Sequence, residues 1–205
     1  MCIRDSIMCF LRDMPAESAM ETLEASLPYK DWIIGIGLDS DERGHPPVKF
    51  KEVYAKAREE GYRLTMHCDV NQENSVQHIW QAIDEIGVER IDHGFNSLED
   101  ENLVREIVSR GIPLTVCPIS NRYVSGDLTG DAIKTMLDKG ICAMINSDDP
   151  SYMQAYLNEN MYALAEECDF SKEELVQLAK NSFLATWMSD EDKAQYLAKV
   201  EEYVG

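Results

Sequence analysis

The strongest constraint on the fold is a unit that repeats along the chain. From residue 7 onward, an apolar run is followed by a polar loop, an amphipathic segment, a glycine and the next apolar run. The apolar runs predict six strands, at 7–11, 32–36, 63–66, 90–91, 114–116 and 143–145. The segments between them predict helices at 16–27, 48–60, 75–86, 101–109 and 132–139, with further helices after residue 145. This alternation is typical of an α/β protein in which right-handed crossovers join parallel strands.

Four glycines mark the joints of this repeat. Gly61, Gly87, Gly111 and Gly140 each stand just past a predicted helix and just before a predicted strand, where a left-handed helix-ending residue belongs. With 205 residues, 44% of them hydrophobic, the chain can bury a core and forms one domain or part of one.

Charge and composition exclude several classes of partner. Asp and Glu number 38 against 19 Lys and Arg, for a net charge of −19, which argues against binding of nucleic acid or of an anionic membrane. No apolar run approaches the roughly 20 residues of a membrane-spanning helix, and no signal-peptide pattern is visible. The six cysteines are scattered without a Cys-x-x-Cys pair, as expected of reduced thiols in a cytoplasmic protein.

The first six residues differ in character from the rest. Met1–Ser6 resemble the translation of a sequencing adapter, so we expect residues 1–6 to be a scar and residues 7–205 to form the domain. The natural chain would then begin further upstream.

Reactive side chains cluster where the predicted strands end. His67, His93 and Cys117 each follow or end an apolar run, and Asp148 and Asp149 follow the sixth. In a (β/α)₈ barrel the carboxyl ends of the strands converge on one mouth, where catalysis occurs. The pattern therefore predicts that these residues share a site.

Each of these residues also has a structural explanation. His67 could be a hydrogen-bonded core histidine, His93 a turn residue, and the paired acids a turn that caps a helix. Two histidines and two carboxylates at the same strand ends favour instead a divalent metal, with zinc suited to such nitrogen and oxygen ligands. His78, inside a predicted helix, is interpreted as a solvated helix residue.

Several motifs, in order, resemble one family. They are 35–42 (GIGLDSDE), 44–50 (GHPPVKF), 90–94 (RIDHG), 114–121 (LTVCPISN), 146–150 (NSDDP) and 157–160 (LNEN). The chain resembles the adenine deaminase branch of the adenosine deaminase family, in the amidohydrolase superfamily, from about residue 7 to its C-terminus. The resemblance implies a zinc-containing TIM (β/α)₈ barrel, with about six of eight βα units present. It also implies hydrolysis of the 6-amino group of a purine, with adenine favoured and adenosine next.

The resemblance assigns roles to individual residues. His67 matches the third histidine ligand of the family's zinc ion, and Asp148 matches its aspartate ligand. His93 matches the histidine that assists the attacking water, and Asp149 matches the aspartate that binds purine N7. Gly35 matches a glycine whose backbone approaches the purine.

Two departures from the family pattern bear on activity. The His-x-His pair of the family's first strand is absent, because no histidine precedes His45. Val70 stands where the family has the glutamate that acts as general acid. Asp69, two residues after His67 and thus on the same side of an extended backbone, is the preferred replacement, with Glu73 as the alternative.

We therefore expect an N-terminally truncated, cytoplasmic, zinc-dependent deaminase of a small-molecule purine. The 205 residues by themselves are expected to bind zinc weakly and to be inactive. A related enzyme acting on a modified 6-aminopurine, and an inactive barrel that binds a purine or a protein partner, remain alternatives. The oligomeric state is left open.

Overall fold

The computed structural model describes residues 6–205, in two compact units that divide after Ser97. The predicted scar at residues 1–6 lies outside the described residues except for Ser6, which begins the first strand. Among residues 6–205, no helix has the length and apolar character needed to cross a membrane.

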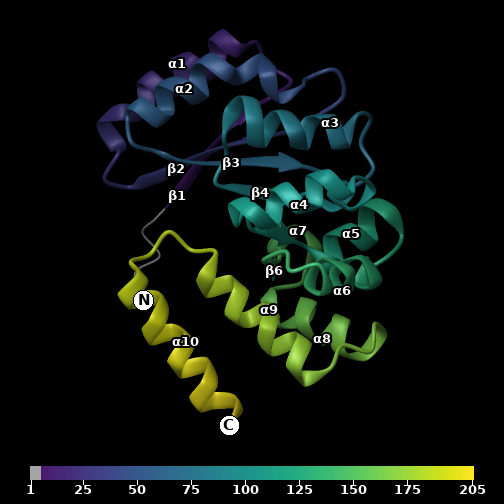
Figure 1. Ribbon diagram of the computed structural model, residues 1–205. Helices are drawn as coiled ribbons and strands as arrows, with labels where there is room; N and C mark the ends of the chain where they lie inside the picture. The colour runs from purple at the N-terminus through teal and green to yellow at the C-terminus, as the bar shows by residue number, and fades with distance from the viewer. Residues whose placement is uncertain (1–5) are drawn as a thin grey trace. The chain divides into compact units, whose positions relative to one another are not determined.

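Unit 1 is a parallel sheet with helices on one face. Its elements are β1 (Ser6–Leu11), α1 (Ala16–Ser26), β2 (Ile33–Asp39), α2 (Lys51–Glu59), β3 (Arg63–Cys68), α3 (Ser75–Trp80) and β4 (Arg90–His93). Short 3₁₀ segments occupy Leu27–Tyr29 and Pro47–Phe50. The strands lie in the order β1-β2-β3-β4, each parallel to its neighbour, and α1, α2 and α3 lie together over one face of the sheet (Figure 1).

Unit 2 is mostly helical around two short strands. Its elements are α4 (Glu101–Arg110), β5 (Leu114–Val116), α5 (Pro118–Ser125), α6 (Gly130–Asp138), β6 (Ala143–Ile145), α7 (Pro150–Met153), α8 (Leu157–Glu167), α9 (Lys172–Leu184) and α10 (Asp190–Val204). β5 pairs with β6 in parallel, and α9 packs between β6 and α10 (Figure 1). A 3₁₀ turn at Phe95–Glu99 spans the boundary between the units.

Local sequence explains these elements. The strands of unit 2 are wholly buried, as apolar strands covered on both faces must be. In α4 the spacing of Leu103, Val104 and Ile107 forms one buried face, and the Asp100 side chain caps the helix by accepting a hydrogen bond from Asn102 N at 2.8 Å.

Helix ends follow the glycines that the sequence marks. Gly87 and Gly111 adopt φ of 74° and 63° at the ends of their helices, confirming their predicted role. The predicted helix 75–86 changes to π-helical geometry at Gln81–Ile86. The helix at Pro118–Ser125 was not predicted, although proline at the first helical position is a common helix start.

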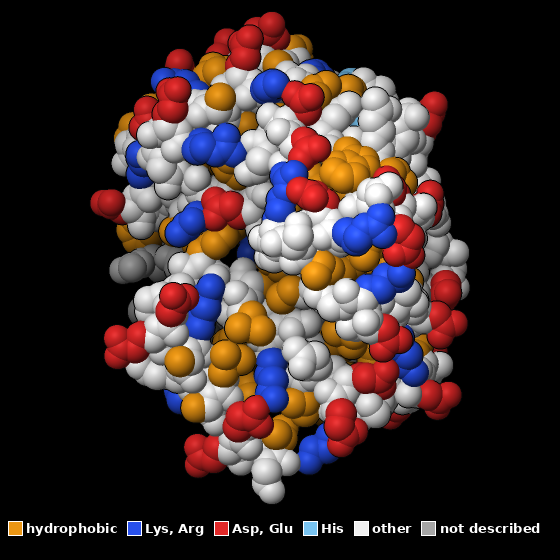
Figure 2. Space-filling view, in the orientation of Figure 1, with side chains coloured by type: hydrophobic (Ala, Val, Ile, Leu, Met, Phe, Trp, Pro, Cys, Tyr) orange, Lys and Arg blue, Asp and Glu red, His pale blue; other side chains and the backbone are white. Residues whose placement is uncertain are grey.

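On the face that Figure 2 draws, acidic side chains are scattered rather than gathered in one patch. Buried charge is confined to a smaller place. Among residues 6–205, Arg12 and Glu42 are the only Arg, Lys, Asp or Glu side chains that are buried, with relative exposures of 0% and 4%. Both belong to unit 1 and lie close to the ends of its strands.

Candidate metal and active site

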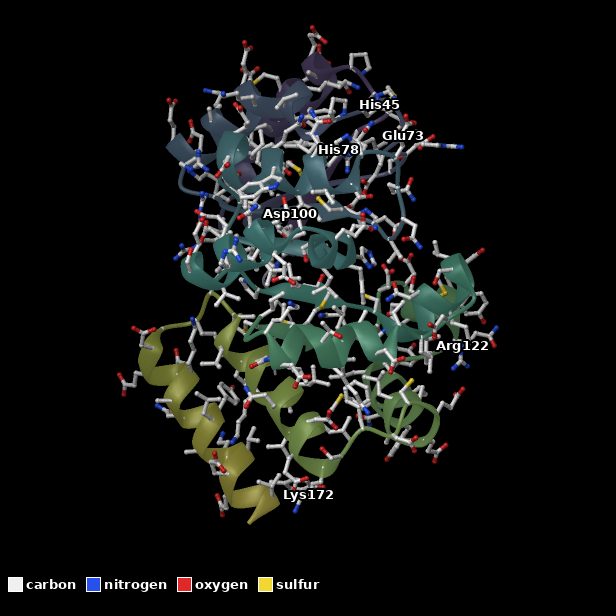
Figure 3. All side chains as sticks on the ribbon, turned by 45° about the vertical axis from the view of Figure 1, so that its right-hand side comes forward. His45, Glu73, His78, Asp100, Arg122 and Lys172 are labelled. Carbon is white, nitrogen blue, oxygen red and sulfur yellow. The ribbon has the colours of Figure 1, made fainter. Side chains whose placement is uncertain are left out.

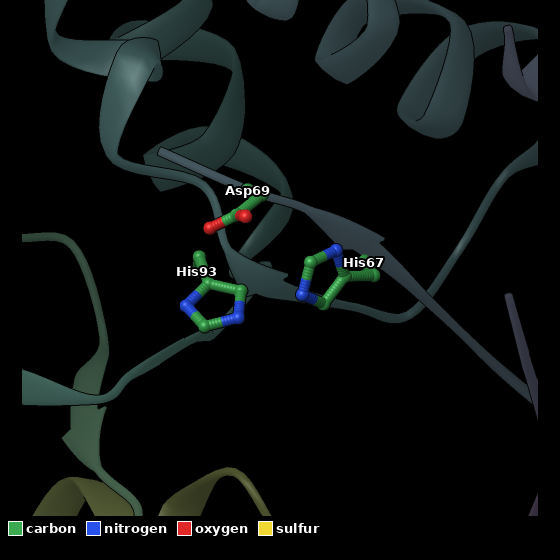
Figure 4. A group of neighbouring side chains, drawn as sticks. All are labelled: His67, Asp69 and His93. Carbon is green, nitrogen blue, oxygen red and sulfur yellow. The ribbon is translucent and has the colours of Figure 1, made fainter. Parts of the chain in front are cut away.

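β3 carries His67 to the carboxyl end of the unit 1 sheet. Burial alternates weakly along Arg63–Cys68, because both faces of this central strand are covered, and His67 is the fifth of its six residues. His67 pairs with Asp92 of β4, and Cys68 pairs with His93. His93 is thus one position away from the residue that pairs with His67, and the two histidine rings lie side by side at the ends of their strands (Figure 4).

His93 has an unusual backbone conformation. It is the last residue of β4, is buried, and has φ of 63°, in the left-handed region that few residues other than glycine occupy. Such a conformation in a bulky residue stores strain of about 1–3 kcal/mol and is concentrated at functional sites. The ring of His93 lies against the ring of His67 at the end of β3 (Figure 4).

His67, Asp69 and His93 form one cluster. One potential ligand atom from each lies within 4.8 Å of the other two. The two imidazole rings are 4.5 Å apart between centroids and nearly perpendicular, at 80°. The rings and the Asp69 carboxylate face a common space (Figure 4). Two imidazoles and a carboxylate at this separation fit the donor set of zinc or a related first-row metal.

Glu42 and Arg12 support this cluster from behind. Glu42 Oε1 lies 2.8 Å from His67 Nδ1 and accepts a hydrogen bond from Asp69 N at 2.9 Å. Arg12 Nη1 lies 3.3 Å from the same Glu42 oxygen and donates to His67 O at 2.8 Å. Arg12 also donates to His45 O from Nε and Nη2, at 3.1 and 2.9 Å.

The buried charges alter two pKa values. Burial lowers the pKa of His67, but the hydrogen bond and the charge of Glu42 outweigh it and raise the pKa to about 8. Burial raises the pKa of Glu42, but the hydrogen bond with His67, the charge of Arg12 and the Asp69 N–H together hold it below its usual range. In the metal-free chain the two groups therefore stabilise each other's charged form.

A polar pocket of about 320 Å³ opens beside the cluster. Its lining residues are Ser40, Asp41, Glu42, Arg43, His67, Asp69 and Gln72. The pocket is thus built from the loop after β2 and the loop after β3. It could admit a small polar molecule next to His67.

Two predicted residues lie away from the cluster. Gly35 pairs with Arg63 at the start of β3, four residues, or roughly 13 Å of strand, before His67. The structure does not bring Gly35 to the cluster. Glu73 is exposed at the start of α3 (Figure 3), and the cluster contains Asp69 rather than Glu73.

The prediction that His78 is a solvated helix residue is wrong. His78 is buried on the inner side of α3, and its Nδ1 lies 4.0 Å from Glu42 Oε2. Burial is the main cause that lowers the pKa of His78, and the positive charge of Arg12 lowers it further. The sequence pattern misled because His78 lies on the buried side of α3, near Glu42 of the loop after β2.

Asp148 and Asp149 follow β6 in unit 2 and are exposed. Asp148, three residues after the end of β6, has φ of 56°, in the left-handed region. Asp149 occupies the position before α7, but its side chain makes no capping hydrogen bond with that helix. Helix capping, the simplest structural explanation of this acid, is therefore not what its carboxylate does.

Sequence reasoning missed Glu42 and Arg12. Glu42 belongs to the motif at 35–42, but Gly35 was the only residue of that motif to which the sequence analysis gave a role. The available signal was an acid three residues beyond the end of a buried strand, and an arginine directly after β1. The two residues that pair are 30 positions apart in the sequence, and no local pattern reports such a contact.

Comparison with known proteins decides the family. The family model described as adenosine deaminase matches residues 2–203. The chain belongs to the adenosine deaminase family. It is 50% identical over 198 residues to an uncharacterised deaminase of Schizosaccharomyces pombe, covering 96% of this chain and 58% of that protein. It is 47% identical over 201 residues to an adenine deaminase of Streptomyces coelicolor, covering 96% of this chain and 58% of that protein.

Solved structures agree on the fold. An adenine deaminase from Arthrobacter aurescens is similar with a TM-score of 0.90 and 40% identity, over 97% of this chain and 61% of that one. An amidohydrolase from Burkholderia ambifaria with bound Zn is similar with a TM-score of 0.86 and 25% identity, over 96% and 56%. The predicted TIM-barrel class is confirmed. The chain spans about 58–60% of the length of the curated relatives that it matches.

Proposed function

We propose that this chain is part of a zinc-dependent deaminase that converts a 6-aminopurine to the 6-oxopurine, adenine in preference to adenosine. The observation that carries the proposal is the cluster of His67, Asp69 and His93, whose ligand atoms lie within 4.8 Å of one another. It supports metal chemistry in a chain that belongs to the adenosine deaminase family.

Each cluster residue takes a distinct role in this reaction. His67 would hold the ion through Nε2, because Nδ1 faces Glu42. Bound zinc would supply a nucleophile at neutral pH, since it lowers the pKa of coordinated water to about 7. His93 accepts or orients the proton of the attacking water. Water adds at C6 of the purine, and the amino group leaves as ammonia.

Asp69 is the proposed general acid. The purine N1 must gain a proton as water adds at C6, and Val70, which is buried at 5% exposure, has none to give. Asp69 Oδ1 accepts a hydrogen bond from Val70 N at 2.7 Å, which fixes the carboxylate beside the two imidazoles. General acid catalysis contributes about 10²–10⁴-fold.

Three assignments rest on family resemblance alone. We propose Asp148 as a metal ligand, Asp149 as the group that binds purine N7, and the Gly35 backbone as a purine contact. Each is tested by its own variant, Asp148→Ala, Asp149→Ala and Gly35→Ala, through zinc content for the first and KM for the others.

The preference for the free base is assigned to the loop after β2. Lys49 Nζ donates to Arg12 O at 2.8 Å and to Met14 O at 2.7 Å, and it lies 3.0 Å from His45 Nδ1. These contacts fasten the Gly44–Phe50 segment to the strand ends. A fixed loop there would occupy the space that the ribose of a nucleoside needs.

An inactive barrel that binds a purine is the second candidate. The observation in its favour is Val70 at the position of the family's general acid. The two candidates differ in one outcome, since an inactive barrel would bind adenine without releasing ammonia.

The test uses the protein extended to the length of its relatives and loaded with zinc. We expect ammonia release from adenine, with kcat/KM for adenine well above that for adenosine, and no turnover by the 205 residues alone. Asp69→Asn should lower kcat by about 10²–10⁴-fold at unchanged zinc content. Glu59→Gln, which alters an exposed acid of α2 outside the pocket, is the control.

Preference for adenosine would overturn the assigned substrate. Adenine binding without ammonia release would favour the inactive barrel. Near-normal kcat in Asp69→Asn would remove Asp69 from the mechanism.

A further inference from the structure

The buried ion pair of unit 1 is directed at one histidine. Arg12 and Glu42 approach each other through one contact, of 3.3 Å between Arg12 Nη1 and Glu42 Oε1, rather than through two parallel hydrogen bonds. Arg12 donates its other hydrogen bonds to the backbone oxygens of His45 and His67. Glu42 directs Oε1 to the ring of His67 and to the backbone of Asp69.

His67 is therefore held at two points. Arg12 fixes its backbone oxygen at 2.8 Å, and Glu42 fixes its ring nitrogen Nδ1 at 2.8 Å. Burying two charges is unfavourable unless their contacts compensate it. A buried pair whose hydrogen bonds converge on a candidate metal ligand is arranged for that ligand rather than for the pair's own stability.

We propose that Glu42 is a positioning residue that fixes the tautomer and orientation of His67, leaving Nε2 as the ligand atom that faces Asp69 and His93. Arg12 is the counter-charge that holds Glu42 in place. The proposal rests on the proposed function only in taking His67 as a metal ligand.

The physical reason is the hydrogen-bond chemistry of the two groups. A neutral imidazole has one N–H donor and one acceptor nitrogen, and an ionised carboxylate can only accept. The His67 proton must therefore sit on Nδ1 when Glu42 is ionised, so the lone pair of Nε2 points the other way. A carboxylate behind a metal-binding histidine also increases its strength as a ligand, and losing it typically weakens metal binding about 10–100-fold.

The first test is the tautomer of His67 in the metal-free 205-residue chain. Two-bond ¹H–¹⁵N correlation NMR, at a pH where the ring is neutral, distinguishes a proton on Nδ1 from one on Nε2. We expect the Nδ1–H form in the unsubstituted protein. The Nε2–H form there would overturn the proposal without any variant.

The second test compares variants of neighbouring acids in the same pocket. Glu42→Ala removes the acceptor, so we expect His67 to shift toward the Nε2–H form and zinc affinity to fall about 10–100-fold. Glu42→Gln retains a side-chain oxygen that can accept from Nδ1–H, and should restore most of the Nδ1–H form. Asp41→Ala is the matched control, because Asp41 pairs with Arg43 and is exposed.

The outcomes separate this proposal from the proposed function. An unchanged tautomer and zinc affinity in folded Glu42→Ala would overturn it, as would an equal change in Asp41→Ala. Absence of deaminase activity in the extended protein would leave the tautomer result standing. Activity combined with the wrong tautomer would overturn the positioning role alone.

Discussion

The two units differ in whether their buried polar groups include charged side chains. Unit 1 buries charge, with Arg12, Glu42 and the partly buried His67 in contact at the strand ends. Unit 2 buries neutral amides. Asn160 Oδ1 accepts from Ile119 N at 3.0 Å and its Nδ2 donates to Tyr156 O at 2.8 Å.

A second amide in unit 2 follows the same principle. The buried Asn181 donates to Ala143 O of β6 at 2.7 Å and accepts from Gln177 at 2.8 Å. These amides satisfy backbone groups of α5 and β6 that would otherwise lie unpaired in the interior. They fix the backbone, and no titratable partner is involved.

This difference distinguishes buried polar groups that stabilise the fold from buried polar groups that serve a site. A buried amide satisfies the backbone at small desolvation cost, whereas a buried ion pair is often no more stable than an apolar replacement. Charge buried beside a candidate metal ligand therefore indicates function, while amides buried beneath helices indicate packing. Asp148 and Asp149 of unit 2 are both exposed.

Arg12→Met should have the largest effect. It leaves Glu42 buried without its counter-charge, and breaking a buried pair lowers stability by about 3–5 kcal/mol. Urea denaturation of the 205-residue chain measures the loss. Arg43→Met, which breaks the exposed pair with Asp41 in the same loop, should change stability far less. Equal losses would show that burial of charge is not what distinguishes this site.

Asn160→Ala should have the next largest effect. The change leaves Ile119 N and Tyr156 O without their side-chain partner, at a cost of about 1–3 kcal/mol. Hydrogen exchange should show the loss in α5 and α8. Asn158→Ala, an exposed position on the same helix, is the control. A loss equal to that of the control would refute the structural role of the amide.

The pH dependence of stability should differ between the units. When a chelator keeps the protein free of metal, the pKa of His67 is raised from 6.5 to about 8. The raised pKa contributes about 2 kcal/mol to the free energy of unfolding. This contribution is fully present below pH 6.5 and is lost as the pH rises through about 8. The lowered pKa of Glu42 adds stability that is present above 4.5 and is lost as pH falls through its folded value.

Unit 1 should therefore be most stable between pH 4.5 and 6.5 with respect to these groups. Hydrogen exchange of β3 against β6, at a series of pH values corrected for intrinsic rates, measures the contrast. Parallel pH profiles in the two strands would contradict it.

The sequence predicted the strands and helices more accurately than it predicted which side chains contact one another. Apolar runs located all six strands, and the glycines located helix ends, because both depend on short-range patterns. His67 and His93 were found because their strands end there. The burial of His78 and the pairing of Arg12 with Glu42 depend on the packing of α3 and of the loop after β2. Packing of that kind joins residues tens of positions apart, and periodicity carries no information on it.

The candidate site of unit 1 should hold a metal through His67, with His93 beside it. The chain has four histidines, so ¹⁵N-histidine NMR during zinc titration of the 205-residue chain tests it directly. We expect weak binding that shifts the resonances of His67 and His93 and leaves those of His45 and His78 unchanged. Zinc shifts confined to His45 and His78, or no shift at any histidine, would contradict the claim.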